Sequence, residues 1–85
     1  MRWEELVGVN VRRLRAAKGL TQEALADSAG IAVRYVGGVE RGEENPTVSV
    51  LGRLANALGV RPAQLLAEPK RETLSGSSRR TVKGE

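Results

Sequence analysis

Apolar residues recur every three or four positions along most of the chain up to Leu66, a spacing that predicts short amphipathic helices. Near the N-terminus, Val7, Val11 and Leu14 share one face in this way. The same pattern gives five helical segments, at about residues 3–18, 22–29, 33–41, 48–58 and from 62 onward. We therefore expect an all-α fold, a compact bundle of five short helices.

Capping and turn residues stand where these segments meet. Four of the expected helix ends carry a glycine, at Gly19, Gly30, Gly42 and Gly59. Such a glycine readily adopts the left-handed conformation that ends a helix. Thr21 and Thr47 precede the second and fourth segments, where a hydroxyl accepts a hydrogen bond from the first turn. Ile31 is placed to fill the corner between two helices, and Pro62 fits the first position of the fifth.

Gly37 and Gly38 interrupt the third segment, and each lowers helix stability by ~1 kcal/mol relative to alanine. A hairpin turn here would need alternating strands on both sides, which the sequence lacks. A helix is favoured, with Val36 and Val39 facing inward and both glycines largely on the solvent side. Either the glycines are merely tolerated at the surface, or they let the backbone approach a partner closely.

The composition narrows the possible chemistry. The 85 residues include no cysteine and no histidine, which excludes disulfides, thiolate metal sites and imidazole catalysis. One Trp, one Tyr and no Phe leave the core to aliphatic side chains. The sequence shows no nucleophile with a base and no phosphate-binding glycine loop. We therefore expect no enzyme activity, cofactor, metal or small-molecule substrate.

The net charge of +4 is unevenly distributed. Residues 1–68 contain nine Lys and Arg against eight Asp and Glu, a net +1, whereas residues 69–85 contain five against two, a net +3. Large apolar residues are almost absent after residue 68, so we expect a folded domain at 1–68 and a basic, disordered tail at 69–85. The tail either contacts phosphates non-specifically or serves only as a solubilising end.

Targeting and membrane signals are not apparent in the sequence. Charged residues interrupt every apolar run well before the ~20 residues of a membrane span. The N-terminal residues contain no apolar signal core. We expect a soluble, cytoplasmic protein without a membrane partner.

Five sequence motifs occur in one order, G-L-T-Q at 19–22, A-x-x-x-G at 26–30, E-R-G at 40–42, N-P-T at 45–47 and A-L-G-V at 57–60. Each is weak alone, but their order and spacing together are specific. On these motifs the chain resembles the lambda-repressor-like helix-turn-helix family of the XRE and Cro type, over about residues 4–67. The resemblance implies that segment 33–41 enters the major groove of double-stranded DNA while segment 22–29 crosses the phosphate backbone.

The resemblance also implies which residues contact DNA. Contacts with base edges would come from Val33, Arg34, Gly37 and Gly38. Arg34 is suited to guanine and Val33 to a thymine methyl group, whereas the glycines let the helix sit close without reading bases. Contacts with the DNA backbone would come from Thr21, Gln22, Tyr35, Arg41 and Asn45. A capping role for Thr21, a plain surface role for Gln22 and core packing for Tyr35 remain alternatives.

Arg15 and Glu40 resemble a structural ion pair that joins the first and third helices in some relatives. The chain departs from the family pattern at three places, with Ala32 instead of a capping Ser or Thr, Glu43 and Glu44 in a loop that often carries basic residues, and Arg61 instead of a cap before the fifth helix. These departures predict weak DNA binding by a monomer.

Family members usually dimerise, which places two recognition helices at half-sites about 34 Å apart. So small a core cannot bury both Leu65 and Leu66 fully, so we expect these residues in a homodimer interface, with help from Trp3 and Leu6. The alternative is that all of them simply complete the core.

Three functions compete. The leading one is sequence-specific DNA binding by a small transcription regulator at a bacterial or phage nucleoid, as a repressor, an autoregulator or a restriction-modification controller. The second is an antitoxin subunit with a protein partner, although the tail lacks the apolar anchors that a toxin-binding segment needs. The third is a protein-interaction module that binds no DNA.

Overall fold

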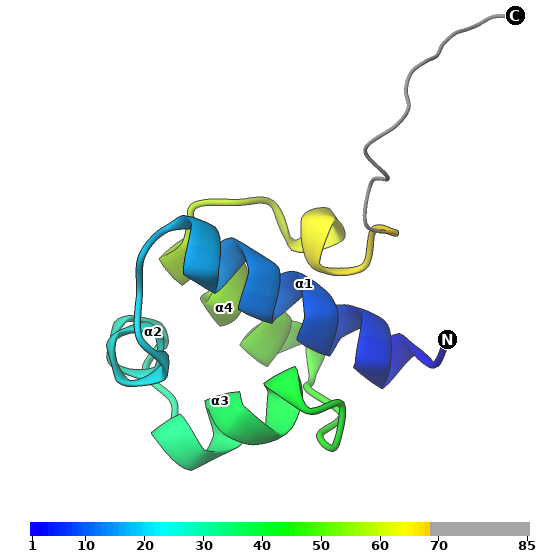
Figure 1. Cartoon of the computed structure of the whole chain (residues 1–85), viewed down its shortest axis with the longest axis horizontal. Coiled ribbons are helices and arrows are strands. Elements are labelled where there is room, and N and C mark those ends of the chain that lie inside the picture. Colours follow the sequence, from blue (N-terminus) through cyan, green and yellow to red (C-terminus); the bar gives the residue numbers. More distant parts are fainter. Residues whose placement is uncertain (69–85) are drawn as a thin grey trace, which may run out of the picture.

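The computed structural model of this chain describes residues 1–68, so the predicted tail at 69–85 lies outside the described residues. Its elements are, in order, α1 (Trp3–Ala17), α2 (Gln22–Ala29), α3 (Val33–Glu40), α4 (Val48–Leu58) and the 3₁₀ helix η1 (Pro62–Leu65) (Figure 1). The all-α prediction is confirmed. The first and third helices end one residue earlier than expected, at positions where Lys18 and Arg41 serve as C-caps.

The prediction of a fifth α-helix is wrong, because η1 is a single 3₁₀ turn of four residues. The physical reason is the side chain of Asn10, which is fully buried on α1. Its Nδ2 donates to the carbonyl oxygen of Leu65 at 2.9 Å and to that of Ala67 at 2.7 Å. These bonds satisfy two carbonyl oxygens at the end of η1 by means of a side chain of α1, and they hold this end against α1. Pro69 has no backbone N–H that could pair with the carbonyl oxygen of Leu65 in a longer α-helix.

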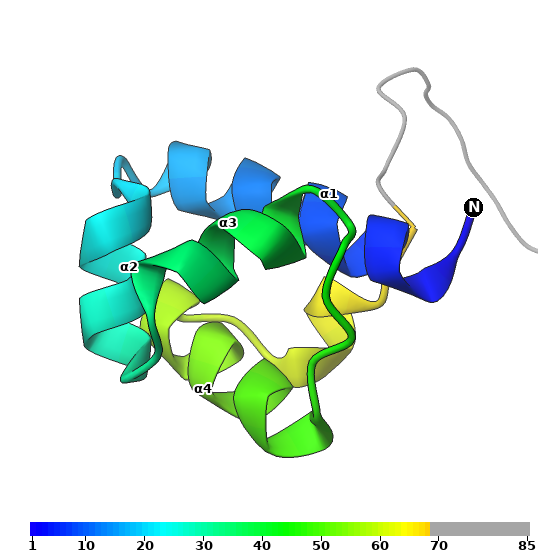
Figure 2. The same cartoon turned by 90° about the horizontal axis from the view of Figure 1, so that it is seen from below.

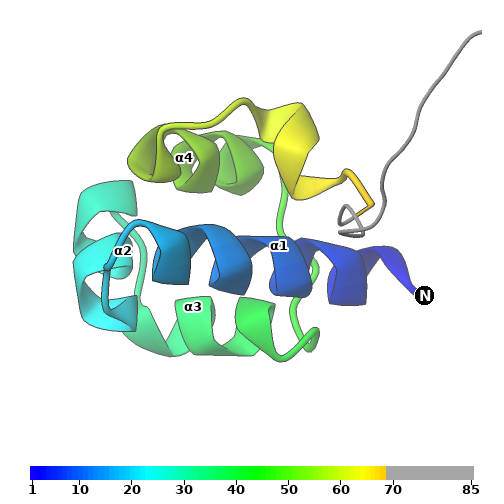
Figure 3. The same cartoon turned by 45° about the horizontal axis from the view of Figure 1, so that its top comes forward.

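Helix α1 runs through the middle of the molecule. Figure 3 shows α3 along one side of α1, α4 with η1 along the other side, and α2 across one end. The contacts agree, since α1 touches α3, α4 and η1, while α2 touches α3 and α4. The helix-turn-helix pair α2 and α3 is therefore held on a frame made by α1 and α4.

The core between these helices is aliphatic, as the composition predicts. Its buried members are Val7, Val11, Leu25, Ala26, Ala29, Val36, Val39, Leu54, Ala55, Leu58 and Leu65. Burying a Leu or Val side chain stabilises a fold by about 1.5–3 kcal/mol. Helix α3 contributes only Val36 and Val39 to this cluster, and two of its eight residues are glycines.

The predicted helix caps are present. Thr21 Oγ1 accepts a hydrogen bond from the backbone N–H of Ala24 at 3.0 Å, and Thr47 Oγ1 accepts one from Val50 at 3.1 Å. The N-cap residue Ala32 makes no side-chain hydrogen bond at the start of α3, as expected. Helix α3 consequently begins without the ~1 kcal/mol that a Ser or Thr cap provides.

Gly8, which the sequence analysis did not identify, sets how closely α1 approaches α3. A Cβ atom added there would lie 2.8 Å from the carbonyl oxygen of Glu40, and closer still to that of Val39. Both obstacles are backbone atoms, so the two helices would have to separate to admit a side chain.

Replacing Gly8 with alanine should therefore lower the free energy of unfolding by about 1–3 kcal/mol, despite the better helix propensity of alanine. Gly52 provides the matched control, because a Cβ added at this α4 position meets nothing within 4 Å. Gly52→Ala should raise stability by about 0.5–1 kcal/mol. Urea denaturation of both variants measures the difference, and a stabilised Gly8→Ala protein would contradict the close approach.

Candidate nucleic-acid interface

Helices α2 and α3 are joined by a tight corner at residues 30–32. Gly30 has φ 71° and ψ 36°, the left-handed conformation, and its backbone N–H bonds to α2 carbonyls. Ile31 packs half-buried against the core, as predicted. Figure 2 views the molecule from the side of α3, which lies across the front with α2 at one end. This geometry is that of a helix-turn-helix pair whose second helix has an open outer face.

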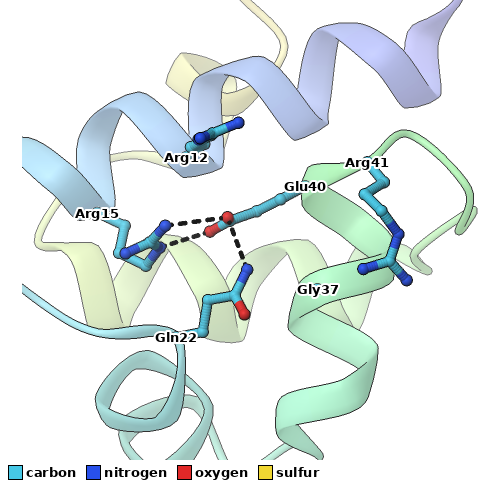
Figure 4. A pocket seen from close by; sticks show the side chains of 6 residues that line it. All are labelled: Arg12, Arg15, Gln22, Gly37, Glu40 and Arg41. Carbon is cyan, nitrogen blue, oxygen red and sulfur yellow. Dashed lines mark hydrogen bonds and ion pairs between the residues drawn. The ribbon is translucent and has the colours of Figure 1, made fainter.

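A network of three polar side chains holds α3 to the other two helices. Arg15 Nε donates to Glu40 Oε2 at 2.6 Å, and Arg15 Nη2 donates to Glu40 Oε1 at 3.1 Å. Gln22 Nε2 donates to Glu40 Oε1 at 3.0 Å (Figure 4). The Glu40 side chain is only 5% exposed. The predicted ion pair is thus present, and Gln22 braces α3 through it.

These contacts shift the acid–base behaviour of the network. Burial alone would raise the pKa of Glu40, but hydrogen bonds from Arg15 and Gln22 outweigh it and hold that pKa below its ordinary value. The hydrogen bond to Glu40 likewise raises the pKa of the Arg15 guanidinium. Both groups are therefore charged at neutral pH and neutralise one another.

A shallow pocket of about 170 Å³ opens beside this network. It is lined by Arg12, Arg15, Gln22, Gly37, Glu40 and Arg41 (Figure 4). Arg15 neutralises the buried Glu40, so the other charges at the pocket are the guanidinium groups of Arg12 on α1 and Arg41 at the end of α3. Arg41 also forms an ion pair with Glu43 at 3.1 Å, but both side chains are about 60% exposed and solvent screens this pair. Two such groups at one opening attract an anion, and planar guanidinium groups suit phosphate oxygens. Arg12 was missed by the sequence analysis.

The outer face of α3 differs from the prediction at its two glycines. Val33 is 41% exposed and Arg34 is exposed, as expected. The expectation that Gly37 and Gly38 face solvent is wrong, because both are buried. Side chains from other positions cover them. A Cβ at Gly37 would lie 3.2 Å from Arg41 Nη1, and one at Gly38 would lie 2.8 Å from Glu44 Cγ.

The residues predicted to contact the DNA backbone are divided between two places. Gln22, at the start of α2, and Arg41, at the end of α3, both line the first pocket, and Arg41 Nε is bonded to Glu43 Oε1 at 3.1 Å. Thr21 precedes Gln22 as the N-cap of α2. Tyr35 packs partly against the core. Burial, and then the negative charge of Glu44, raise the pKa of its hydroxyl. Asn45 instead lines a second, more apolar pocket.

This second pocket has a volume of about 80 Å³ and is lined by Trp3, Glu4, Val7, Asn45, Pro46, Leu51 and Leu66. Trp3 is 69% exposed and Leu66 is 40% exposed, so two large apolar side chains border it. Leu65 is fully buried in the core of its own chain. The prediction of Leu65 as an interface residue is therefore wrong, and of the predicted pair only Leu66 has an exposed side chain.

Within residues 1–68, no group of three or more acidic, Cys or His side chains is arranged to hold a metal ion. None of the helices in this part of the chain is long and apolar enough to cross a membrane.

Acid should destabilise the fold through Glu40. The folded-state pKa of Glu40 lies below its ordinary value of 4.5, so the network contributes its full stability above that value. This contribution is lost as the pH falls from about 4.5 through the lower folded-state pKa, while Arg15 stays charged. Urea denaturation between about pH 7 and pH 3 should show the loss, and Glu40→Gln should reduce its pH dependence. The matched variant Glu23→Gln, at an exposed α2 position, should keep it. An unchanged slope in Glu40→Gln would exclude Glu40 as its source.

Comparison with known proteins gives a consistent family. Residues 11–65 match the helix-turn-helix family model HTH_3. The HTH-type transcriptional regulator y4dJ of Sinorhizobium fredii is 46% identical over 77 residues, covering 91% of this chain and 99% of that protein. Control protein C.SmaI of Serratia marcescens is 43% identical over 63 residues, covering 74% and 75%.

The fold is also shared with a solved structure. The restriction-modification controller protein C.AhdI from Aeromonas hydrophila aligns with a TM-score of 0.71 and 45% identity, over 73% of this chain and 94% of that one. These relatives are regulators and controller proteins, not enzymes. On the family match, the motif geometry and these relatives, the chain belongs to the XRE-type, lambda-repressor-like helix-turn-helix family of DNA-binding transcription regulators.

Proposed function

We propose that this protein binds a specific double-stranded DNA site as a homodimer and represses transcription, including that of its own gene. The observation that carries the proposal is the exposed N-terminal half of α3, held in a fixed orientation by the buried Glu40 network at its other end. A short helix presented in this way fits the width of the major groove. The transcriptional regulators and controller proteins among the relatives support a regulatory role.

Arg34 and Val33 are the residues proposed to contact base edges directly. Both are exposed in the first turn of α3, the part of a recognition helix that enters the groove. Arg34 can donate two hydrogen bonds to guanine, and Val33 can contact a thymine methyl group. Gly37 and Gly38 have no side chains to contact bases, and other side chains lie over them. We therefore expect few direct base contacts, supplemented by recognition of DNA shape.

Phosphate groups are proposed to bind at the junction of α1, α2 and α3. Arg12 and Arg41 supply charge at the 170 Å³ pocket, and Gln22 lines it between them. The N-terminus of α2, capped by Thr21, adds the positive end of a helix dipole. Tyr35 on α3 and Asn45 in the loop that follows it remain proposed contacts with the DNA backbone, although neither lines this pocket.

The proposed dimer interface is the second pocket with its bordering side chains, Trp3 and Leu66. Exposed apolar side chains around a shallow apolar pocket favour self-association, because they remove apolar surface from water. Two copies joined there would present two α3 helices to half-sites about 34 Å apart, one helical turn of DNA.

Arg34→Ala tests the DNA proposal. Selection from random double-stranded DNA at about 100 mM salt should give the wild-type protein a two-fold symmetric site. Arg34→Ala should lose about 1–3 kcal/mol of discrimination at one base pair of each half-site. Arg61→Ala removes the same charge from an exposed residue before η1 and should keep the preference. Absence of any selected site for the wild type would refute the proposed function and direct the search to a protein partner.

Leu66→Glu tests the dimer. A charge at this exposed position should weaken self-association by about 2 kcal/mol without unfolding the monomer. Val9→Glu is a matched control, since Val9 is 41% exposed and does not line the second pocket. Sedimentation equilibrium of all three proteins gives the association constants. A wild-type protein that stays monomeric at high micromolar concentration would exclude the dimer.

A further inference from the structure

The side chain of Glu44 occupies the space that a side chain at position 38 would fill. A Cβ added to Gly38 would lie 2.8 Å from Glu44 Cγ and 3.1 Å from Glu44 Oε2. The loop is fixed here, because the backbone N–H of Glu43 donates to the carbonyl oxygen of Gly38 at 2.9 Å. Glu44 is half-buried as a result. The Glu44 carboxylate therefore lies against α3 at Gly38, although Glu44 itself belongs to the loop after the helix.

Glu44 covers the same face of α3 that carries Arg34. Residues four apart lie above one another on a helix, so Gly38 is one turn beyond Arg34 and points away from the buried Val36. One helical turn is about 5.4 Å long, and successive bases of one strand are about 3.4 Å apart. A group over Gly38 is thus placed to meet a base pair one or two steps from the one that Arg34 contacts.

The Glu44 carboxylate has no hydrogen bond or ion pair with any other residue of the described range 1–68. The neighbouring acids differ in this respect, because Glu40 is bonded to Arg15 and Glu43 to Arg41. Burial, and then the negative charge of Glu44, raise the pKa of Tyr35 on α3, so the Glu44 carboxylate acts on this helix electrostatically. An acceptor without a partner, held on the recognition face, has its bonding capacity available to a ligand.

We propose that Glu44 is a specificity-determining residue, and that its carboxylate accepts a hydrogen bond from the amino group of a cytosine in the major groove. This inference rests on the proposed binding of DNA by α3. An ionised carboxylate is only an acceptor, so it pairs with the cytosine amino group and is repelled by the acceptor edges of guanine and thymine. Glu44 in the loop thereby makes the base contact that a side chain at position 38 of the helix would otherwise make.

The same carboxylate lowers affinity for every other sequence. Placed near phosphates, a negative charge opposes the counterion release that drives non-specific binding. At a site with the matching cytosine, the hydrogen bond offsets the repulsion between Glu44 and the phosphates. At other sequences no such hydrogen bond forms, and the repulsion lowers the affinity. Glu44 therefore selects its site largely by rejecting alternatives, which is an efficient route to specificity.

Glu44→Gln is the first variant that tests this role. The experiment titrates full-length protein against the selected site and against versions with each base pair replaced, and follows fluorescence anisotropy. Glu44→Gln should reduce a roughly tenfold preference for cytosine at one position to about twofold. It should also bind random-sequence DNA several times more tightly, with a salt slope steeper by about 1.

Two further variants separate position from charge. Gly38→Ala keeps the charge of Glu44, but the new methyl group would lie 2.8 Å from Glu44 Cγ and displace that side chain. This variant should therefore lose the same cytosine preference. Glu43→Gln makes the same charge change one residue away, at a side chain that is 60% exposed and bonded to Arg41. It should leave the cytosine preference intact, although general affinity for DNA rises.

The outcomes distinguish this inference from the proposed function. If Arg34→Ala weakens discrimination while Glu44→Gln changes no base preference, the role of Glu44 is overturned and DNA recognition by α3 stands. Equal changes in Glu44→Gln and Glu43→Gln would mean that only bulk charge acts, which also overturns it. A wild-type protein without any sequence preference would overturn both.

Discussion

The position of α3 depends on the buried contact between Arg15, Gln22 and Glu40. Helix α3 has only eight residues, includes two glycines and begins without a side-chain cap. Isolated helices of this length are unstable in water, so tertiary contacts must hold it. Val36 and Val39 supply the apolar contacts, and Gly8 allows a close approach to α1. Among the described residues 1–68, the Glu40 network alone ties α3 to both α1 and α2 by side-chain hydrogen bonds.

A glutamate at position 40 would destabilise the fold without the hydrogen bonds from Arg15 and Gln22. It is the last residue of α3, where the helix dipole favours a cation. Its side chain is also almost fully buried, which disfavours an isolated carboxylate. Two hydrogen bonds from Arg15 and one from Gln22 reverse both effects. They also cancel the charge of Glu40, which leaves Arg12 and Arg41 to set the electrostatic potential of the adjacent pocket.

Local signals in the sequence were sufficient to predict the helices α1 to α4. Contacts between residues far apart in the sequence could not be predicted from them. Period, glycine ends and the Thr21 and Thr47 caps act over a few residues, and the first four helices and both caps predicted from them agree with the structure to within one residue. The shortened fifth helix depends on Asn10, which bonds to a residue 55 positions away. A lone asparagine between Val7 and Val11 on an apolar face was the only indication of it.

The failure at Gly37 and Gly38 has the same origin. Helical periodicity placed both glycines correctly, on the side of α3 opposite the core, but periodicity says nothing about which other side chains fold over them. The covering groups come from α2, from the end of α3 and from the loop, at Gln22, Arg41 and Glu44. The solvent exposure of a glycine depends on which side chains lie over it in the fold. The spacing of apolar residues along the sequence did not identify those side chains.

The two glycines leave space on α3 that the side chains of Arg41 and Glu44 occupy, so in the proposed recognition of DNA the residues after the helix form part of the contact surface. Alanine at both positions would strengthen α3 by about 2 kcal/mol in total, but its methyl groups would displace side chains that now lie on the helix. A loop side chain can change without disturbing helix packing, because the core beneath α3 uses only Val36 and Val39. On the proposed role of Glu44, a substitution at this loop position would change which DNA is bound while the fold and the orientation of α3 stay constant.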